Sequence, residues 1–214
     1  MTSPNGMTWT SCTSPVASFW KSVTYSDELF VAVAQDAVGE TDCVMTSANG
    51  KNWKSGTAAA NYAWVSVTYG NNMFVAVSET GYDQVMTSPN GENWTSRSAA
   101  VAKDWRSVTY SDGKFVAVAG SDGNNDVMTS TDGETLMIVS SGVDALWYSV
   151  TFGGRTFVAV AFGGNSQIMT SSDGATWTAQ DSPAESKWQS VTFGANMSVA
   201  VASDGEDGEF VMNG

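Results

Sequence analysis

The sequence predicts an all-β fold of five similar four-stranded antiparallel sheets, and three observations lead to this prediction. A motif of Trp, any residue, Ser-Val-Thr and then Tyr or Phe occurs five times in 214 residues, at steps of 44, 41, 42 and 41 residues. Each copy contains four short runs rich in β-branched and aromatic residues, and clusters of Gly, Asn and Asp separate these runs. The copies begin at Trp20, Trp64, Trp105, Trp147 and Trp188.

The runs are apolar or small on both of their alternating faces. In the first copy, Ser22 and Thr24 alternate with Val23 and Tyr25. A sheet with one wet face would carry a polar residue at every second position, so each sheet is expected to be covered on both sides. Four-stranded sheets of this length that cover one another are the blades of a β-propeller. We therefore expect one domain, residues 1–214, with five blades at 20–63, 64–104, 105–146, 147–187 and 188–214, and a closing strand within 1–19.

Both ends of the chain lie inside a repeat. The chain starts with the last part of one copy, residues 2–9, and stops after the third run of another, at Met212. The strand missing from the last copy is thus the extra strand at the start. We expect the N-terminal strand to complete the C-terminal blade, which would close the ring and leave no unpaired edge.

The connections between strands differ in how constant they are. The turns between the first and second strands have a constant length, as do the connections between copies, and the turns between the third and fourth strands carry Asn-Gly or Asp-Gly. Only the loops between the second and third strands vary, with 10, 7, 8, 7 and 9 residues. We call these the variable loops, and we call the end of the sheets where they emerge the top face. Binding surfaces vary in this way, so a ligand is expected there.

Charge and hydropathy exclude several classes of partner. The net charge is −13 with nine basic residues, and binding of nucleic acid or an anionic membrane requires clustered Lys and Arg. No apolar run approaches a membrane span, and no basic and apolar leader is visible. An acidic, soluble monomer is expected, with its compartment left open and an extracellular, virion or cell-surface setting compatible with the sequence.

The turn motif Thr-Ser-x-(Asn/Asp)-Gly-x-x-Trp resembles the Asp-box, the bacterial neuraminidase repeat of sialidases and related propellers. It is a shortened variant, because the family motif has one more residue between Asp and Gly. In that family the motif is a structural turn away from the active site, and the resemblance implies the same here. The matching positions are Ser3, Ser47, Ser88, Ser130 and Ser171, with Asn5, Asn49, Asn90, Asp132 and Asp173.

Catalysis is not expected. Sialidases use three converging arginines, whereas Arg155 lies in a turn opposite the top face and cannot join Arg97 and Arg106. The five inner strands contain no acidic residue, although glycosidases need a pair of carboxylates. The absence of histidine excludes Ser-His-Asp catalysis and most zinc sites. The only acids close to the inner strands are Asp104, Asp144 and Glu185.

Two further features leave alternatives open. Asp122, Asn124 and Asp126 have the alternate spacing of a calcium loop, but the same residues also form ordinary polar turns. Calcium is therefore the one cofactor that we consider. Cys12 and Cys43 have no equivalents in the other copies, and they either form a disulfide between neighbouring blades or remain two separate thiols.

The predicted ligand site lies on the top face. Polar and aromatic residues follow the first Trp of several inner strands or lie in the variable loops, a combination that sugar-binding sites use. A lectin-like module similar to five-bladed tachylectin-type lectins is the first interpretation. The alternatives are a protein-interaction scaffold, which photosystem assembly-factor propellers resemble, and an engineered or reconstructed propeller without a native ligand. The predicted residues are Lys21, Tyr82, Arg106, Tyr148, Phe162 and Gln189.

Overall fold

The computed structural model describes residues 1–26, 28–35, 42–121, 123–164, 166–204 and 211–213. These residues form five antiparallel sheets. The first contains β1 (Phe19–Tyr25), β2 (Phe30–Gln35), β3 (Val44–Ser47) and β4 (Lys54–Gly56). The second contains β5 (Trp64–Gly70), β6 (Met73–Ser78), β7 (Val85–Ser88) and β8 (Thr95–Arg97). The third contains β9 (Trp105–Ser111), β10 (Lys114–Ala119), β11 (Val127–Ser130) and β12 (Met137–Val139).

The fourth sheet contains β13 (Ala145–Gly153), β14 (Thr156–Gly164), β15 (Ile168–Ser171) and β16 (Thr178–Gln180). The fifth has three strands, β17 (Trp188–Gly194), β18 (Met197–Ala202) and β19 (Val211–Asn213). In every sheet the strands pair in chain order. Among the described residues, no helix is long and apolar enough to cross a membrane.

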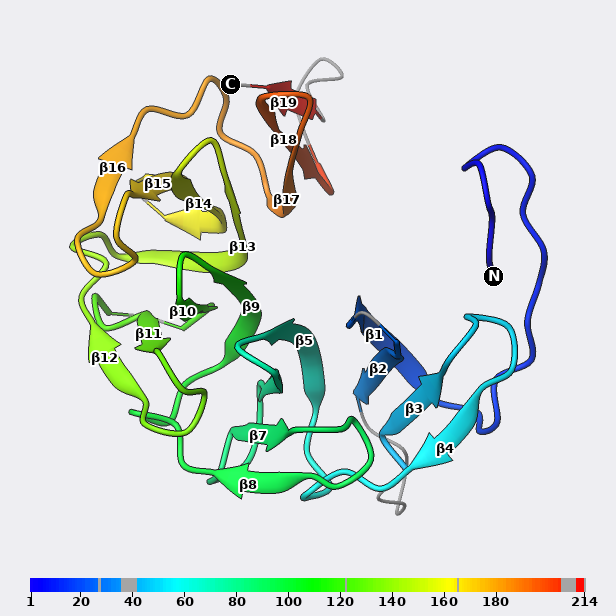
Figure 1. The fold of residues 1–214 in the computed structure, drawn as a ribbon. Helices are drawn as coiled ribbons and strands as arrows, with labels where there is room; N and C mark the ends of the chain where they lie inside the picture. The colour runs from blue at the N-terminus through cyan, green and yellow to red at the C-terminus, as the bar shows by residue number, and fades with distance from the viewer. Residues whose placement is uncertain (27, 36–41, 122, 165, 205–210, 214) are drawn as a thin grey trace.

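The sheets follow one another around an arc, with the first strand of each sheet on the inside (Figure 1). β1 packs on β5, β5 on β9, β9 on β13 and β13 on β17, and the second strand of each of the first four sheets also packs on the inner strand of the next. The predicted all-β arrangement of repeated antiparallel sheets is confirmed, with four strands in each of the first four sheets and three described strands in the fifth. The five inner strands begin at or within two residues of the five predicted Trp positions.

The motif serine ties neighbouring inner strands together. Ser66 Oγ accepts a hydrogen bond from the backbone N–H of Val108 in the next sheet, at 3.1 Å. Ser149 Oγ accepts the same bond from Val191 at 3.1 Å. The contact also occurs between the first and second sheets and between the third and fourth. These inner strands do not share a ladder, so the side chain satisfies a backbone donor that packing would otherwise bury.

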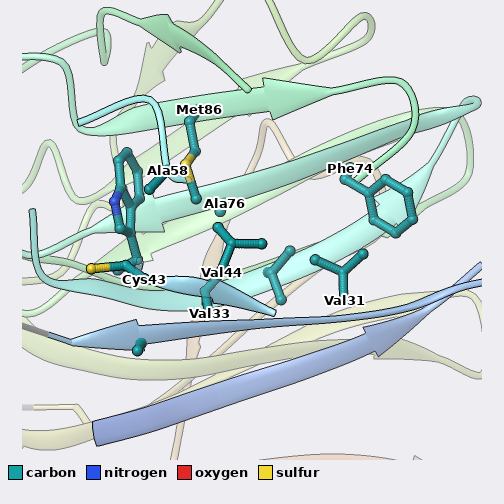
Figure 2. Close-up of a cluster of buried hydrophobic side chains, with 11 residues drawn as sticks. Val31, Val33, Cys43, Val44, Ala58, Phe74, Ala76 and Met86 are labelled. Carbon is teal, nitrogen blue, oxygen red and sulfur yellow. The ribbon is translucent and has the colours of Figure 1, made fainter. Parts of the chain in front are cut away.

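The core lies between successive sheets. Val31 and Val33 of β2 and Val44 of β3 pack against Phe74 and other side chains of the second sheet (Figure 2). The same arrangement of Val side chains against the next inner strand recurs between the later sheets. The inner-strand Trp side chains are buried, apart from half-buried Trp20 in the first sheet.

The turns that resemble Asp-boxes are locally closed by hydrogen bonds. Asn49 Oδ1 accepts from the backbone N–H groups of Lys51 and Asn52, both at 2.9 Å, and Trp53 Nε1 donates to Gly50 O at 3.0 Å. Asp173 makes the same bonds through Oδ1 to Ala175 and Thr176. The turn motif therefore acts as structure, as its Asx chemistry predicts.

We expect Asp173→Asn to leave the melting temperature at pH 7 within about 2 °C, because Asn49 makes the same bonds in the first sheet. The backbone N–H groups of Thr176 and Ala175 lower the pKa of Asp173 to about 2. A carboxyl with a lowered folded pKa stabilises the fold above its unfolded pKa of about 3.9 and loses this contribution as pH falls through the folded value. Melting curves between pH 5 and pH 2 should therefore fall less steeply for the variant, and more steeply for the reciprocal Asn49→Asp. Parallel curves for all three proteins would contradict this.

Closure of the ring by the N-terminal strand is not seen in the structure. Residues 1–10 fold back on themselves, and Thr2 forms an antiparallel bridge with Thr10. Among the described strands, β19 is the last strand of the fifth sheet. Figure 1 shows the N-terminal segment and β19 on opposite sides of an opening in the arc. Closure within one chain therefore stays a prediction.

The disulfide considered for Cys12 and Cys43 does not form in this structure. Cys43 is buried in the core between the first and second sheets, where its Sγ lies 4.0 Å from Asn61 Oδ1. Cys12 lies in the N-terminal segment, against the other face of the first sheet, beside Val23 and Ala32. The first sheet lies between the two thiols.

Candidate functional site

A β-bulge at the start of every inner strand presents one residue to the top face. The register shifts directly after the first Trp of each strand, so that the second residue has no partner on the neighbouring strand. A bulge of this kind turns the side chain of the extra residue out of the regular alternation. Four of the six predicted ligand-site residues occupy this position. The five bulge residues are Lys21, Val65, Arg106, Tyr148 and Gln189.

Arg106 links three sheets. Its Nη1 lies 2.5 Å from Glu79 Oε1, and its Nη2 lies 4.0 Å from Asp104 Oδ2. Glu79 Oε2 in turn accepts a hydrogen bond from Gln35 Nε2 at 3.4 Å. The Arg106 side chain lies against Gly120, where an added Cβ would come within 3.1 Å of Arg106 Nε. The guanidinium is therefore held in one position by charge and by close backbone contact.

Aromatic rings and cations continue from Arg106 across the fourth and fifth sheets. The Arg106 guanidinium carbon lies 5.2 Å from the centre of the Tyr148 ring, and the centres of the Tyr148 and Phe162 rings are 5.7 Å apart. Lys187 Nζ lies 5.7 Å from the centre of the Phe162 ring and 2.7 Å from Asp204 Oδ2. Such contacts favour a fixed stacking geometry. We call the set Arg106, Tyr148, Phe162 and Lys187 the cation–aromatic ladder.

The other predicted residues lie outside the ladder. Gln189 Nε2 donates to Ser203 Oγ at 3.0 Å in the fifth sheet. Lys21 is exposed on the first sheet and lines a cavity with Cys12 and Trp20. Tyr82 is 91% exposed in the variable loop of the second sheet, so it has little packing to fix it. The structure thus brings three of the six predicted residues together.

Sequence reasoning missed Glu79, Gln35 and Lys187. Glu79, Gln35 and Phe162 occupy equivalent positions, directly after the apolar run of the second strand in their copies. Comparison of this position between copies would have found both polar residues. Lys187 directly precedes its inner-strand Trp, and only the folded chain places it over Phe162. Hydrogen bonds from the Lys187 side chain and backbone N–H to the Asp204 carboxylate also lower the pKa of Asp204.

The loop considered for calcium is engaged by groups of the protein itself. Asp126 is fully buried and its Oδ1 lies 2.6 Å from Lys103 Nζ, while Asn124 O accepts a hydrogen bond from the backbone N–H of Ser141. Asp122 lies outside the described residues. Among the residues that the structure describes, no group of three Asp, Glu or Cys side chains could hold a metal ion.

The three acids that precede inner strands do not form a catalytic pair in the described contacts. Asp104 faces Arg106, and Asp144 Oδ1 accepts from the backbone N–H of Gly123 at 3.0 Å. Glu185 lines a separate small cavity beside Gln167. The arrangement on the top face can stack flat groups and pair with charges, which are means of binding a ligand.

No protein-family model matches the chain, and no curated protein matches it. Among solved structures, it is similar to YCF48 bound to a D1 peptide, with 14% identity and a TM-score of 0.64 over 88% of this chain and 62% of that one. It is also similar to a chain of a nidogen–laminin complex, with 10% identity and a TM-score of 0.65 over 87% of this chain and 73% of that one. The computationally designed Ika8 protein matches with 14% identity and a TM-score of 0.58 over 92% and 70%.

These similarities and the repeated four-stranded meanders establish the fold. The chain has the β-propeller architecture. It spans 62% of the length of the peptide-bound YCF48 chain, so the two differ in extent as well as in sequence. At these identities the comparison concerns the fold alone.

Proposed function

We propose that the chain is a non-catalytic scaffold that binds a protein or peptide partner on its top face. The observation that carries this proposal is the cation–aromatic ladder, which crosses the third to fifth sheets at the end that bears the variable loops. Every member is held by a neighbour before a ligand arrives. Preorganised aromatic side chains bind with a small loss of conformational entropy, and aromatic residues and Arg dominate protein-binding surfaces.

The charges around the ladder indicate the chemistry of the partner. Arg106 and Lys187 are already paired with Glu79 and Asp204, whereas the chain as a whole carries a net charge of −13. A segment that places an apolar or aromatic side chain on Tyr148 and Phe162, with Lys or Arg toward the acidic surroundings, would be complementary. The structures of YCF48 with a D1 peptide and of the nidogen–laminin complex contain similar propellers with peptide or protein partners, which supports this class of ligand by analogy.

Carbohydrate binding, the first interpretation from the sequence, has no specific support from the comparisons. Tyr148 could also stack on a sugar ring, so the two ligand classes share part of one surface. The similarity to a designed propeller is compatible with a scaffold without a native ligand. Carbohydrate binding and the absence of a native ligand are therefore the two results of the following test that would contradict the proposal.

A displayed library of random peptides should be enriched in basic and aromatic sequences by the wild-type protein, and a glycan array should stay blank. Tyr148→Ala should weaken binding of an enriched peptide at least about tenfold, because it removes the centre of the ladder. Tyr148→Phe, which keeps the ring, should retain binding. Affinities measured by fluorescence polarisation, with unchanged melting temperatures, would check this.

Tyr82→Ala is the matched control, because it removes the same side chain from the same face outside the ladder. It should change the affinity less than twofold or so. Loss of binding with Tyr82→Ala but not with Tyr148→Ala would place the site on the variable loop of the second sheet. Glycan binding without peptide enrichment would overturn the proposal in favour of a lectin, and two blank results would favour a scaffold without a ligand.

A further inference from the structure

The N-terminal segment is a preformed copy of the hairpin formed by the third and fourth strands of each of the first four sheets. The bridge between Thr2 and Thr10 has the register of the pairs Thr46–Lys54 and Thr170–Thr178 in the first and fourth sheets. Its turn has the same internal bonds, including Trp9 Nε1 to Gly6 O at 3.0 Å. We call residues 1–12 the N-terminal hairpin.

The fifth sheet lacks this hairpin. β19 pairs with β18 on one side, and no described strand pairs with its other edge. In the first sheet the equivalent residues Val44 and Met45 pair with Gly56 and Ser55. By the same register, Val211, Met212 and Asn213 would pair with Cys12, Ser11 and Thr10, so that Asn213 takes the place of Thr2 beside Thr10.

A cavity beside β18 matches the missing hairpin. The other four sheets carry Phe at the second-strand position that Ser198 occupies in the fifth. In the fourth sheet this residue is Phe157, and the centre of its ring lies 6.4 Å from the centre of the Trp177 ring in the turn. Ser198 instead lines a cavity of about 440 Å³ with apolar walls that include Val158, Ile168 and Met212. Trp9, the turn Trp of the hairpin, is 58% exposed, whereas Trp177 is 9% exposed.

The two ends of the arc also have complementary faces. Val23 of β1 is 60% exposed, whereas Val67, which occupies the same position in β5, is 5% exposed because the first sheet covers it. At the other end, Val201 of β18 is 43% exposed, although its equivalent Val33 is fully buried. Val201 thus lies on the kind of face that covers an inner strand elsewhere in the arc, whereas Val23 lies on an inner strand that no sheet covers.

We propose that this end of the arc binds a second copy of the chain, with the partner's N-terminal hairpin on β19 and its Trp9 in the cavity beside Ser198. A second copy is the occupant because the chain's own hairpin lies across the opening, packed near the first sheet (Figure 1). The contact is head-to-tail, so it generates a ring or a longer assembly of copies. It does not depend on the top-face ligand.

Val211→Cys tests the pairing, because the register places it opposite the native Cys12. Paired residues of antiparallel strands have Cα atoms about 4.5–5.5 Å apart, which a disulfide can span. Mild oxidation should give covalently linked copies on a non-reducing gel, with residue 12 of one copy bonded to residue 211 of another by peptide mass. The control Cys12→Ser/Val211→Cys should not give this linkage.

A second readout needs no engineered bond. By light scattering, the mass of the wild-type protein should rise with concentration, and Trp9→Ala should shift this rise to at least about tenfold higher concentration. A bond between residues 12 and 211 within one monomer would overturn the second copy in favour of closure within the chain. The absence of any such bond, or identical association of wild type and Trp9→Ala, would overturn docking of the hairpin altogether.

Discussion

Trp105→Ala is expected to lower the melting temperature by about 6–20 °C. Trp105 is fully buried in the core between the second and third sheets, and its Nε1 donates to Val101 O at 3.2 Å. Truncation of a buried Trp costs about 3–5 kcal/mol, and each kcal/mol shifts the melting temperature of a chain of this size by about 2–4 °C. Calorimetry of the two proteins would measure the shift.

Trp20→Ala is the internal comparison for Trp105. It makes the same change at the equivalent position of the first sheet, where no preceding sheet covers the side chain and Trp20 is only half-buried. At dilute, monomeric concentrations its effect should be less than half as large. Equal losses for the two variants would show that the first sheet is covered in solution as fully as the third.

Lys103→Met is expected to cost about 3–5 kcal/mol at pH 7, because it leaves the fully buried Asp126 without its counter-charge. Burial already raises the pKa of Asp126 even with Lys103 in contact. When the folded pKa lies above the unfolded value, the folded state holds the proton more tightly, so stability falls as pH rises through that window. Urea denaturation of the variant should therefore show a midpoint that recovers as the pH is lowered.

The double variant Lys103→Met/Asp126→Gln should regain much of this loss. Gln84 and Gln167 occupy the position of Asp126 in the second and fourth sheets, and each bonds the backbone of the residue two before the next inner-strand Trp. A Gln at position 126 could bond Ala145 in the same way. If the single variant is as stable as the wild type at every pH, or if the double variant recovers nothing, the pair does not have this role.

The repeated residues made the fold predictable. The inner-strand Trp, the Val-Ala-Val run and the Asn-Gly turns each act through local pairing and alternation, which the sequence displays directly. The place of the N-terminal hairpin was not predictable in this way. It depends on the total rotation from the first sheet to the fifth over four successive packing steps. This angle is a sum over side-chain contacts that no single repeat encodes.

Only part of the cation–aromatic ladder was predicted from the sequence. Arg106, Tyr148 and Phe162 differ from their equivalents, and that difference was visible in the sequence. Their partners were harder to find because Glu79 and Lys187 reach the ladder from neighbouring sheets. The burial of Asp126 was missed for a related reason, since an Asp in a polar loop gives no sign that a Lys from the preceding connection will cover it.

The serine bridge between inner strands has a consequence for how such a chain could arise. Each copy carries both halves of the contact, the Ser that accepts and the Val whose N–H donates, so any copy can follow any other. Duplication or loss of one unit would leave every remaining junction chemically complete. A change in the number of units therefore costs little stability at each junction. It is unfavourable only at the first and last units, which have to find partners.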